Sequence, residues 1–155
     1  MEKSKIRRAP TVLTRTVLHR ALLGVRAEAP HAEALASAVD DWESGSGAIE
    51  DIGNWDVSLV TSLKDLFRDR TGFNADLNRW DTSRVTSMHS TFKKARAFNG
   101  AISSWDTSRV LQMNGMFTSA SEFNGDLSEW NVGQVTMMNN MFQFAKYFNQ
   151  DLSKW

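Results

Sequence analysis

Large apolar residues recur along most of this chain at a constant spacing of 25 positions. Columns of tryptophan, phenylalanine, valine, and leucine or methionine all keep the same register, without an insertion or a deletion. The aromatic columns are Trp55, Trp80, Trp105, Trp130 and Trp155; Phe67, Phe92, Phe117 and Phe142; and Phe73, Phe98, Phe123 and Phe148. A single unit of this length is too short to enclose its own apolar side chains, so neighbouring units must stack and share one core.

The spacing of apolar residues inside one unit predicts short extended segments and helical turns. Val60 and Leu63 are three positions apart, as are Leu77 and Trp80, which suits extended chain with bends. The stretch from Leu63 to Phe67 has a spacing nearer to that of a helical turn. Stacked units separated by about 4.8 Å, the spacing of paired strands, would place each residue type on its own copy.

We therefore expect an α/β repeat solenoid with three regions. Residues 1–30 form a basic amphipathic arm whose apolar pattern favours a helix from Thr11 to Val25. Residues 31–47 hold a second, capping helix and an exit loop. Residues 48–155 form a leucine-rich-repeat-like stack of four 25-residue coils, with a short parallel β-sheet on one side and helical or 3₁₀ turns on another. The first coil is atypical, since Arg70 stands where later coils have alanine, and this suits the capped end of a stack.

Polar columns are as regular as the apolar ones. One column of asparagines predicts an inward structural ladder in which each amide bonds the backbone of a turn. A second column of acids, each followed two residues later by serine, predicts turns that bond nearby N–H groups. A calcium ladder is the alternative for the acids, but the Gly-rich spacing of calcium-binding β-rolls is missing. The columns are Asn74, Asn99, Asn124 and Asn149, and Asp56, Asp81 and Asp106.

Composition removes several classes of chemistry. The chain has no cysteine, and its three histidines lie apart without metal-ligand spacing, so the sequence predicts no catalytic thiol and no metal centre. No phosphate-binding loop or nucleophile motif is present, and no column singles out one copy as an active site. We expect a protein that is not an enzyme and has no catalytic residues, no cofactor and no small-molecule substrate.

The positions that vary between coils are the best candidates for a binding surface. Basic residues occupy neighbouring positions of the first two coils, and aromatic residues occupy or adjoin the same positions of the fourth. The last coil also ends on an apolar face that invites self-association or a partner. A solvated face with one exposed aromatic pair is the equally weighted alternative. The candidate partner-binding residues are Arg68, Arg70, Lys93, Lys94, Arg96, Phe144, Tyr147 and Trp155.

The repeat resembles a known family. The string Trp-Asp-Thr-Ser-x-Val-x-x-Met, followed by Met-Phe-x-x-Ala-x-x-Phe-Asn-x-Asp-Leu-Ser-x-Trp, is similar to a bacterial surface-protein repeat of the same approximate length. That repeat occurs in mycoplasma and Listeria lipoproteins and in marine microalgae, and it is grouped near BspA-like leucine-rich repeats. The matching residues are Trp105, Asp106, Ser108, Val110, Met113, Met116, Phe117, Ala120, Phe123, Asn124, Asp126, Leu127 and Trp130. The resemblance implies adhesive or protein-binding use and brings no catalytic residues.

Two functions follow from these patterns. The first is a protein-binding or scaffold module that serves as an accessory subunit of a larger assembly. The second is a free-standing adhesion module of the cell-surface type. The sequence shows no secretory signal peptide, lipobox cysteine or transmembrane segment, which favours the first function and an intracellular or organellar location. For the basic arm, three roles stay open: docking on protein, contact with an anionic membrane or RNA, and organelle targeting.

Overall fold

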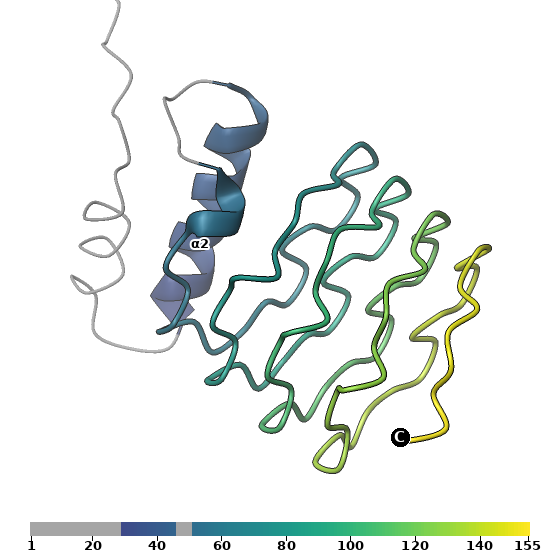
Figure 1. Cartoon of the computed structure of the whole chain (residues 1–155). Helices are drawn as coiled ribbons and strands as arrows, with labels where there is room; N and C mark the ends of the chain where they lie inside the picture. The colour runs from purple at the N-terminus through teal and green to yellow at the C-terminus, as the bar shows by residue number, and fades with distance from the viewer. Residues whose placement is uncertain (1–28, 46–50) are drawn as a thin grey trace, which may run out of the picture.

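A computed structural model describes residues 29–45 and 51–155 of the chain. The predicted basic arm, including the helix expected from Thr11 to Val25, lies outside the described residues except for its last two positions. Figure 1 shows one helix followed by a series of coils that lie side by side up to the last residue.

The helix α2 spans Ala29–Glu43, where the apolar pattern predicts the capping helix. Its buried stripe contains Leu35, Ala38 and Val39. Gly45 follows the helix with a φ of 63°, a value that suits glycine, and its N–H donates to the carbonyl oxygen of Trp42. This turn stops the helix just after its buried stripe.

One further regular element is described before the coils begin. The 3₁₀ helix η1 spans Ile52–Asn54, and the Asp51 carboxylate caps it by accepting a hydrogen bond from the N–H of Gly53. Ile52 and Gly53 are buried.

The coils are chains of tight turns that bond to their neighbours in a fixed register. Within a coil, N–H groups donate three residues back, as Val60 does to Val57 and Trp80 to Leu77. Between coils, four N–H groups of one coil donate to four carbonyl oxygens of the next, at N···O distances of 2.7–3.0 Å. In the first pair of coils the donors are Leu63, Asp65, Phe67 and Asp69, and the acceptors are Ser87, His89, Thr91 and Lys93.

The predicted α/β solenoid with a parallel sheet is wrong; of the two predicted amino-terminal helices, the described residues contain one, and the other lies outside them. The described residues contain one α-helix, one 3₁₀ helix and no strand, and the coils are joined only by the isolated parallel bridges Ser62–Ser87, Ser87–Gln112 and Gln112–Met137. The physical reason lies in the backbone: residues such as Ser90 and Lys94 have left-handed φ values of 55° and 62°, which interrupt an extended chain. The leucine-rich-repeat-like architecture therefore does not hold, although the stacking of equivalent residues does.

The core consists of aromatic columns. Phe92 lies 5.2 Å from Phe67 and 5.6 Å from Phe117, measured between ring centroids, and the rings are nearly parallel. The Trp80 and Trp105 rings stack at 6.1 Å. Each indole N–H reaches back to a carbonyl oxygen of the preceding coil: Trp80 to Ile52, Trp105 to Leu77, Trp130 to Ile102 and Trp155 to Leu127. These bonds fix the register that apolar contact alone would leave open.

Helix α2 covers the first coil, as Figure 1 shows. The guanidinium of Arg70 bonds to the carboxylates of Asp40 and Glu43 on the helix, and its Nε donates to the carbonyl oxygen of Leu66. The Arg70 side chain is only 16% exposed. Arg70, which replaces the alanine of later coils, thus supplies the contact that holds α2 against the first coil.

The asparagine column forms a ladder on the outside of the stack, and not in its interior as predicted. The side-chain oxygens of Asn74, Asn99 and Asn124 each accept a hydrogen bond from the backbone N–H of the next asparagine in the column, at 2.8–2.9 Å. All four asparagines are exposed. The inward position is wrong because the phenylalanine before each asparagine takes the buried side of the turn.

We expect Asn124→Leu to lower the free energy of unfolding by about 1 kcal/mol, because it removes one partly solvated hydrogen bond. The matched control is Asn149→Leu, since the Asn149 oxygen accepts no hydrogen bond from any described residue, and this change should be nearly neutral. Urea titration of both variants measures the difference. Equal losses would show that the ladder bond contributes nothing.

Candidate partner-binding surface

Two left-handed positions recur in every coil. The first holds Asp65, Ser90, Gly115 and Asn140, and the second holds Asp69, Lys94, Ser119 and Phe144, all with φ between 55° and 65°. Aspartate, asparagine and glycine tolerate this conformation, whereas a bulky aromatic residue in it is a genuine outlier. Phe144 therefore stands in a backbone conformation that its residue type disfavours.

Phe144 also lies on the surface. Its side chain is 74% exposed, and that of Tyr147 in the same turn region is 50% exposed. The Lys146 ammonium lies 4.6 Å from the centre of the Tyr147 ring and donates to the Tyr147 hydroxyl, which raises the lysine pKa. An exposed apolar ring on a strained backbone does not stabilise the folded chain. The surface around Phe144 is therefore a candidate binding site.

The last coil carries a second feature, which we call the donor row: the backbone N–H groups of Met138, Asn140, Phe142 and Phe144. In each earlier coil, the equivalent four groups donate to the following coil. Within the described part of the chain, no group accepts a hydrogen bond from the donor row. Beside it, Phe142, Phe148, Leu152 and Trp155 are only partly buried, whereas their counterparts in earlier coils are buried. Figure 1 shows no further coil beyond this one, which is drawn in yellow.

Three of the five basic candidates, Arg68, Arg70 and Lys94, have acidic partners in the structure. Arg68 pairs with Asp65 and Asp69, and Lys94 pairs with Asp69. Neighbouring carboxylates therefore neutralise much of the positive charge of these two residues. The hydrogen bond from Lys94, together with the charges of Lys94 and Arg68, lowers the pKa of Asp69. Arg70 is engaged with α2. Of the eight predicted residues, Phe144 and Tyr147 lie exposed on two successive turns of the last coil, and Trp155 lies partly buried in the same coil.

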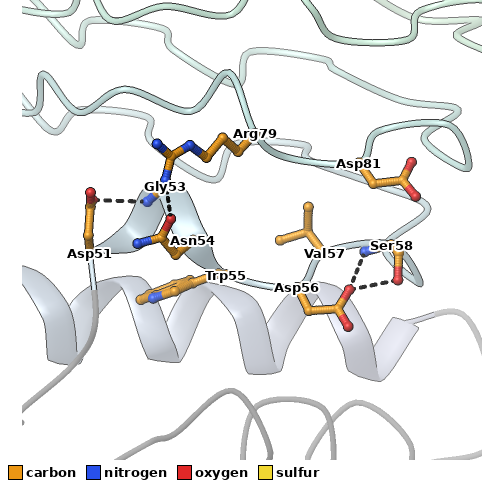
Figure 2. Close-up of a pocket in the computed structure, with 9 residues that line it drawn as sticks. All are labelled: Asp51, Gly53, Asn54, Trp55, Asp56, Val57, Ser58, Arg79 and Asp81. Atoms are coloured by element: carbon orange, nitrogen blue, oxygen red, sulfur yellow. Dashed lines mark hydrogen bonds between the residues drawn. The ribbon is translucent and has the colours of Figure 1, made fainter.

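A hollow of about 900 Å³ lies at the first coil, and Figure 2 shows the residues that line it. Its polar groups are already engaged: the Arg79 guanidinium donates to the side-chain oxygen of Asn54 at 2.7 Å, and the Asp56 carboxylate accepts from the N–H and hydroxyl of Ser58. No group of three or more potential metal ligands converges anywhere in the described residues. These polar groups of the hollow therefore form a turn and a contact between neighbouring coils.

The acidic column forms turns of the kind predicted. Asp81 accepts from the N–H of Ser83 at 3.0 Å, and Asp106 accepts from the N–H of Ser108 at 2.9 Å. The Ser108 hydroxyl and then its N–H lower the pKa of Asp106, so the carboxylate stays charged well below neutral pH. The acids thus stabilise the bends that carry the chain from one coil to the next.

Sequence reasoning missed two parts of this surface. The donor row consists of backbone groups, so no residue type marks it. The left-handed backbone at Phe144 was also missed, although the column Asp65, Ser90, Gly115 and Asn140 contains residues that favour this conformation and could have indicated a left-handed turn nearby.

The geometry of the described residues defines a class first: a protein of stacked, hydrogen-bonded coils that follow a single α-helix. The chain belongs to the family described as Mycoplasma protein of unknown function, DUF285, whose model matches residues 33–155. This agrees with the predicted resemblance to a mycoplasma-type repeat. No curated protein and no solved structure matches the chain. Among the described residues, none of the helices is long and apolar enough to cross a membrane.

Proposed function

We propose that this protein is a non-catalytic protein-binding or scaffold module that acts as an accessory subunit of a larger assembly inside the cell. The observation that carries the proposal is Phe144, an exposed aromatic side chain on a left-handed backbone. A residue that costs folding energy and buries nothing within the chain is accounted for by contact with another molecule. Aromatic side chains are also the residues that most often dominate protein interfaces.

The surroundings of Phe144 support a protein partner. Tyr147 and Lys146 add a second exposed ring and a cation beside it. The described polar groups are occupied in turns, which supports binding rather than catalysis. The resemblance of the motif to a bacterial surface-protein repeat supports the same use, since that resemblance implies an adhesive or protein-binding role.

The variant Phe144→Asn separates binding from stability. Asparagine tolerates the left-handed conformation better than phenylalanine, so we expect the free energy of unfolding to rise by about 0.5–1 kcal/mol. The same change removes the exposed ring. The amount of partner protein captured by chemical cross-linking in the source cells should therefore fall several-fold. Thermal melts and quantitative mass spectrometry of the cross-linked material measure the two effects.

The matched control is Ser119→Asn, which lies at the equivalent position of the preceding coil with a φ of 60°. It should leave the captured partners unchanged. A gain in stability for Phe144→Asn with no loss of partners would contradict the proposed role of this surface.

A further inference from the structure

Three asparagines of the chain are followed directly by glycine: Asn99, Asn114 and Asn124. This dipeptide has its own reactivity, because glycine carries no side chain that hinders its backbone nitrogen from attacking the preceding amide. The attack closes a succinimide ring and releases the side-chain nitrogen as ammonia. All three pairs have the same two residues, so their surroundings in the fold decide how they differ.

Two of the pairs lie in the asparagine ladder on the outside of the stack. Asn99 and Asn124 are exposed, and the glycines after them are only partly buried. Among the described residues, no group accepts a hydrogen bond from the backbone N–H of Gly100 or of Gly125. The nitrogen that would attack is therefore not held by a hydrogen bond at either place.

The ladder also prepares the two amides for attack. The side-chain oxygens of Asn99 and Asn124 each accept a hydrogen bond at 2.9 Å from the backbone N–H of the next asparagine in the column. A donor in this position stabilises the negative charge that develops on the oxygen when the amide carbon is attacked. Within the described part of the chain, neither side-chain nitrogen donates a hydrogen bond, so the leaving group is not retained.

The third pair is held by the contacts between coils. Gly115 is buried, and its N–H donates to the carbonyl oxygen of Asn139 at 2.9 Å. The backbone carbonyl oxygen of Asn114 accepts from the N–H of Ser90 at 3.0 Å. Attack by the Gly115 nitrogen would have to break a hydrogen bond between coils in a buried segment. Asn114 thus has the reactive dipeptide without the freedom to react.

We propose that Asn99 and Asn124 are sites of spontaneous deamidation in the folded protein, whereas Asn114 is protected. The glycine nitrogen forms a bond to the side-chain carbonyl carbon, the bond from that carbon to the amide nitrogen breaks, and the proton of the glycine N–H leaves with ammonia. One water molecule from the solvent then opens the ring. Opening at the side-chain carbonyl gives aspartate, and opening at the main-chain carbonyl gives isoaspartate, whose main chain runs through the former side chain.

The reaction would act on the contact between coils. Isoaspartate in place of Asn99 lengthens the main chain at the ladder and moves the oxygen that accepts the N–H of Asn124. The same holds one coil further on, where the oxygen of Asn124 accepts the N–H of Asn149. The modification therefore weakens the stack with the age of the molecule, and it does not depend on the proposed binding function.

The test is incubation of the full chain at mildly alkaline pH, followed by peptide mass spectrometry with electron-transfer fragmentation, which separates isoaspartate from aspartate. Both products should accumulate several-fold faster at Asn99 and Asn124 than at Asn114. In concentrated urea, where the fold is lost, Asn114 should react as fast as the other two.

The ladder supplies its own control for the role of glycine. Asn74 and Asn149 are also exposed in the same column, but alanine and glutamine follow them. Their side chains should remain amides over the period in which Asn99 and Asn124 react.

The variant Gly125→Ala localises the reaction. The added methyl group hinders the attack, so the products at Asn124 should fall several-fold, while the rate at Asn99 stays unchanged. The new Cβ atom would meet only the edge of the Phe123 ring, and circular dichroism checks that the coils remain folded.

Equal rates at the three asparagine–glycine pairs of the folded chain would overturn the proposal, as would amides that persist at Asn99 and Asn124 as they do at Asn74. A rate at Asn124 that Gly125→Ala leaves unchanged would also contradict it. So would rates at Asn99 and Asn124 that rise in urea as strongly as the rate at Asn114, because the fold would then protect all three pairs.

Discussion

Replacing Trp105 by alanine is expected to lower the free energy of unfolding by about 3–5 kcal/mol, the range for removal of a large aromatic side chain from a packed interior. The ring is 3% exposed and lies between Trp80 and Trp130, at centroid distances of 6.1 and 6.3 Å. Its indole N–H also donates to the carbonyl oxygen of Leu77. The loss therefore removes contacts with the coils on both sides, and a cavity remains.

The same substitution at Trp155 is the matched control. That ring is only partly buried and has one neighbouring coil, so Trp155→Ala should cost less than half as much. Urea or thermal unfolding of the two variants measures the difference. If Trp105→Ala melts within a degree or two of the unaltered chain, the tryptophan column does not hold the coils together.

The second large effect is expected at Gly100, where neighbouring coils come closest. A Cβ atom there would lie 1.9 Å from the carbonyl oxygen of Ala75, which is a backbone atom of the preceding coil. Gly100→Ala must therefore push two coils apart, and we expect a loss of about 2–3 kcal/mol, as for other overpacked interiors.

Two other glycines provide the comparison. At Gly125 a Cβ atom would meet only the edge of the Phe123 ring, at 2.9 Å, so Gly125→Ala should cost less. Gly72 faces open space, and Gly72→Ala should change stability by no more than about 0.5 kcal/mol. A chemical denaturation series in which all three variants unfold alike would reject the close approach at Gly100.

The stacking of equivalent residues could be predicted from the sequence because apolar columns have only one way to be buried together. The tryptophan and phenylalanine columns do stack on their own copies in the structure. The β-sheet was wrongly predicted because stacking at strand spacing was equated with strand backbone. The three-residue spacing of Val60 and Leu63 already disagreed with the two-residue period of strands. Tight turns with left-handed corners satisfy that spacing and the inter-coil bonds together.

The candidate surface was predictable only in part. Phe144 and Tyr147 stood out because they are aromatic at positions where earlier coils have polar or smaller residues. A partial offset of the basic residues by Asp65 and Asp69 could be predicted from the sequence, but the particular ion pairs depend on how the turns bring side chains together. Arg70 was correctly linked to the atypical first coil, but its two helix partners lie far back in the sequence and left no local signal.

The constant register has a consequence for how such a protein can change its length. Each coil bonds to the next through the same positions. If residues 81–105 were excised, Trp80 would be followed directly by Asp106, which occupies the same position of the repeat as Asp81. The backbone hydrogen bonds and phenylalanine stacks between the coils joined in this way would then have counterparts already present in the molecule. Duplication or loss of a genetic segment that encodes one whole repeat can thus lengthen or shorten the protein stepwise, while α2 and the last coil keep their own surroundings.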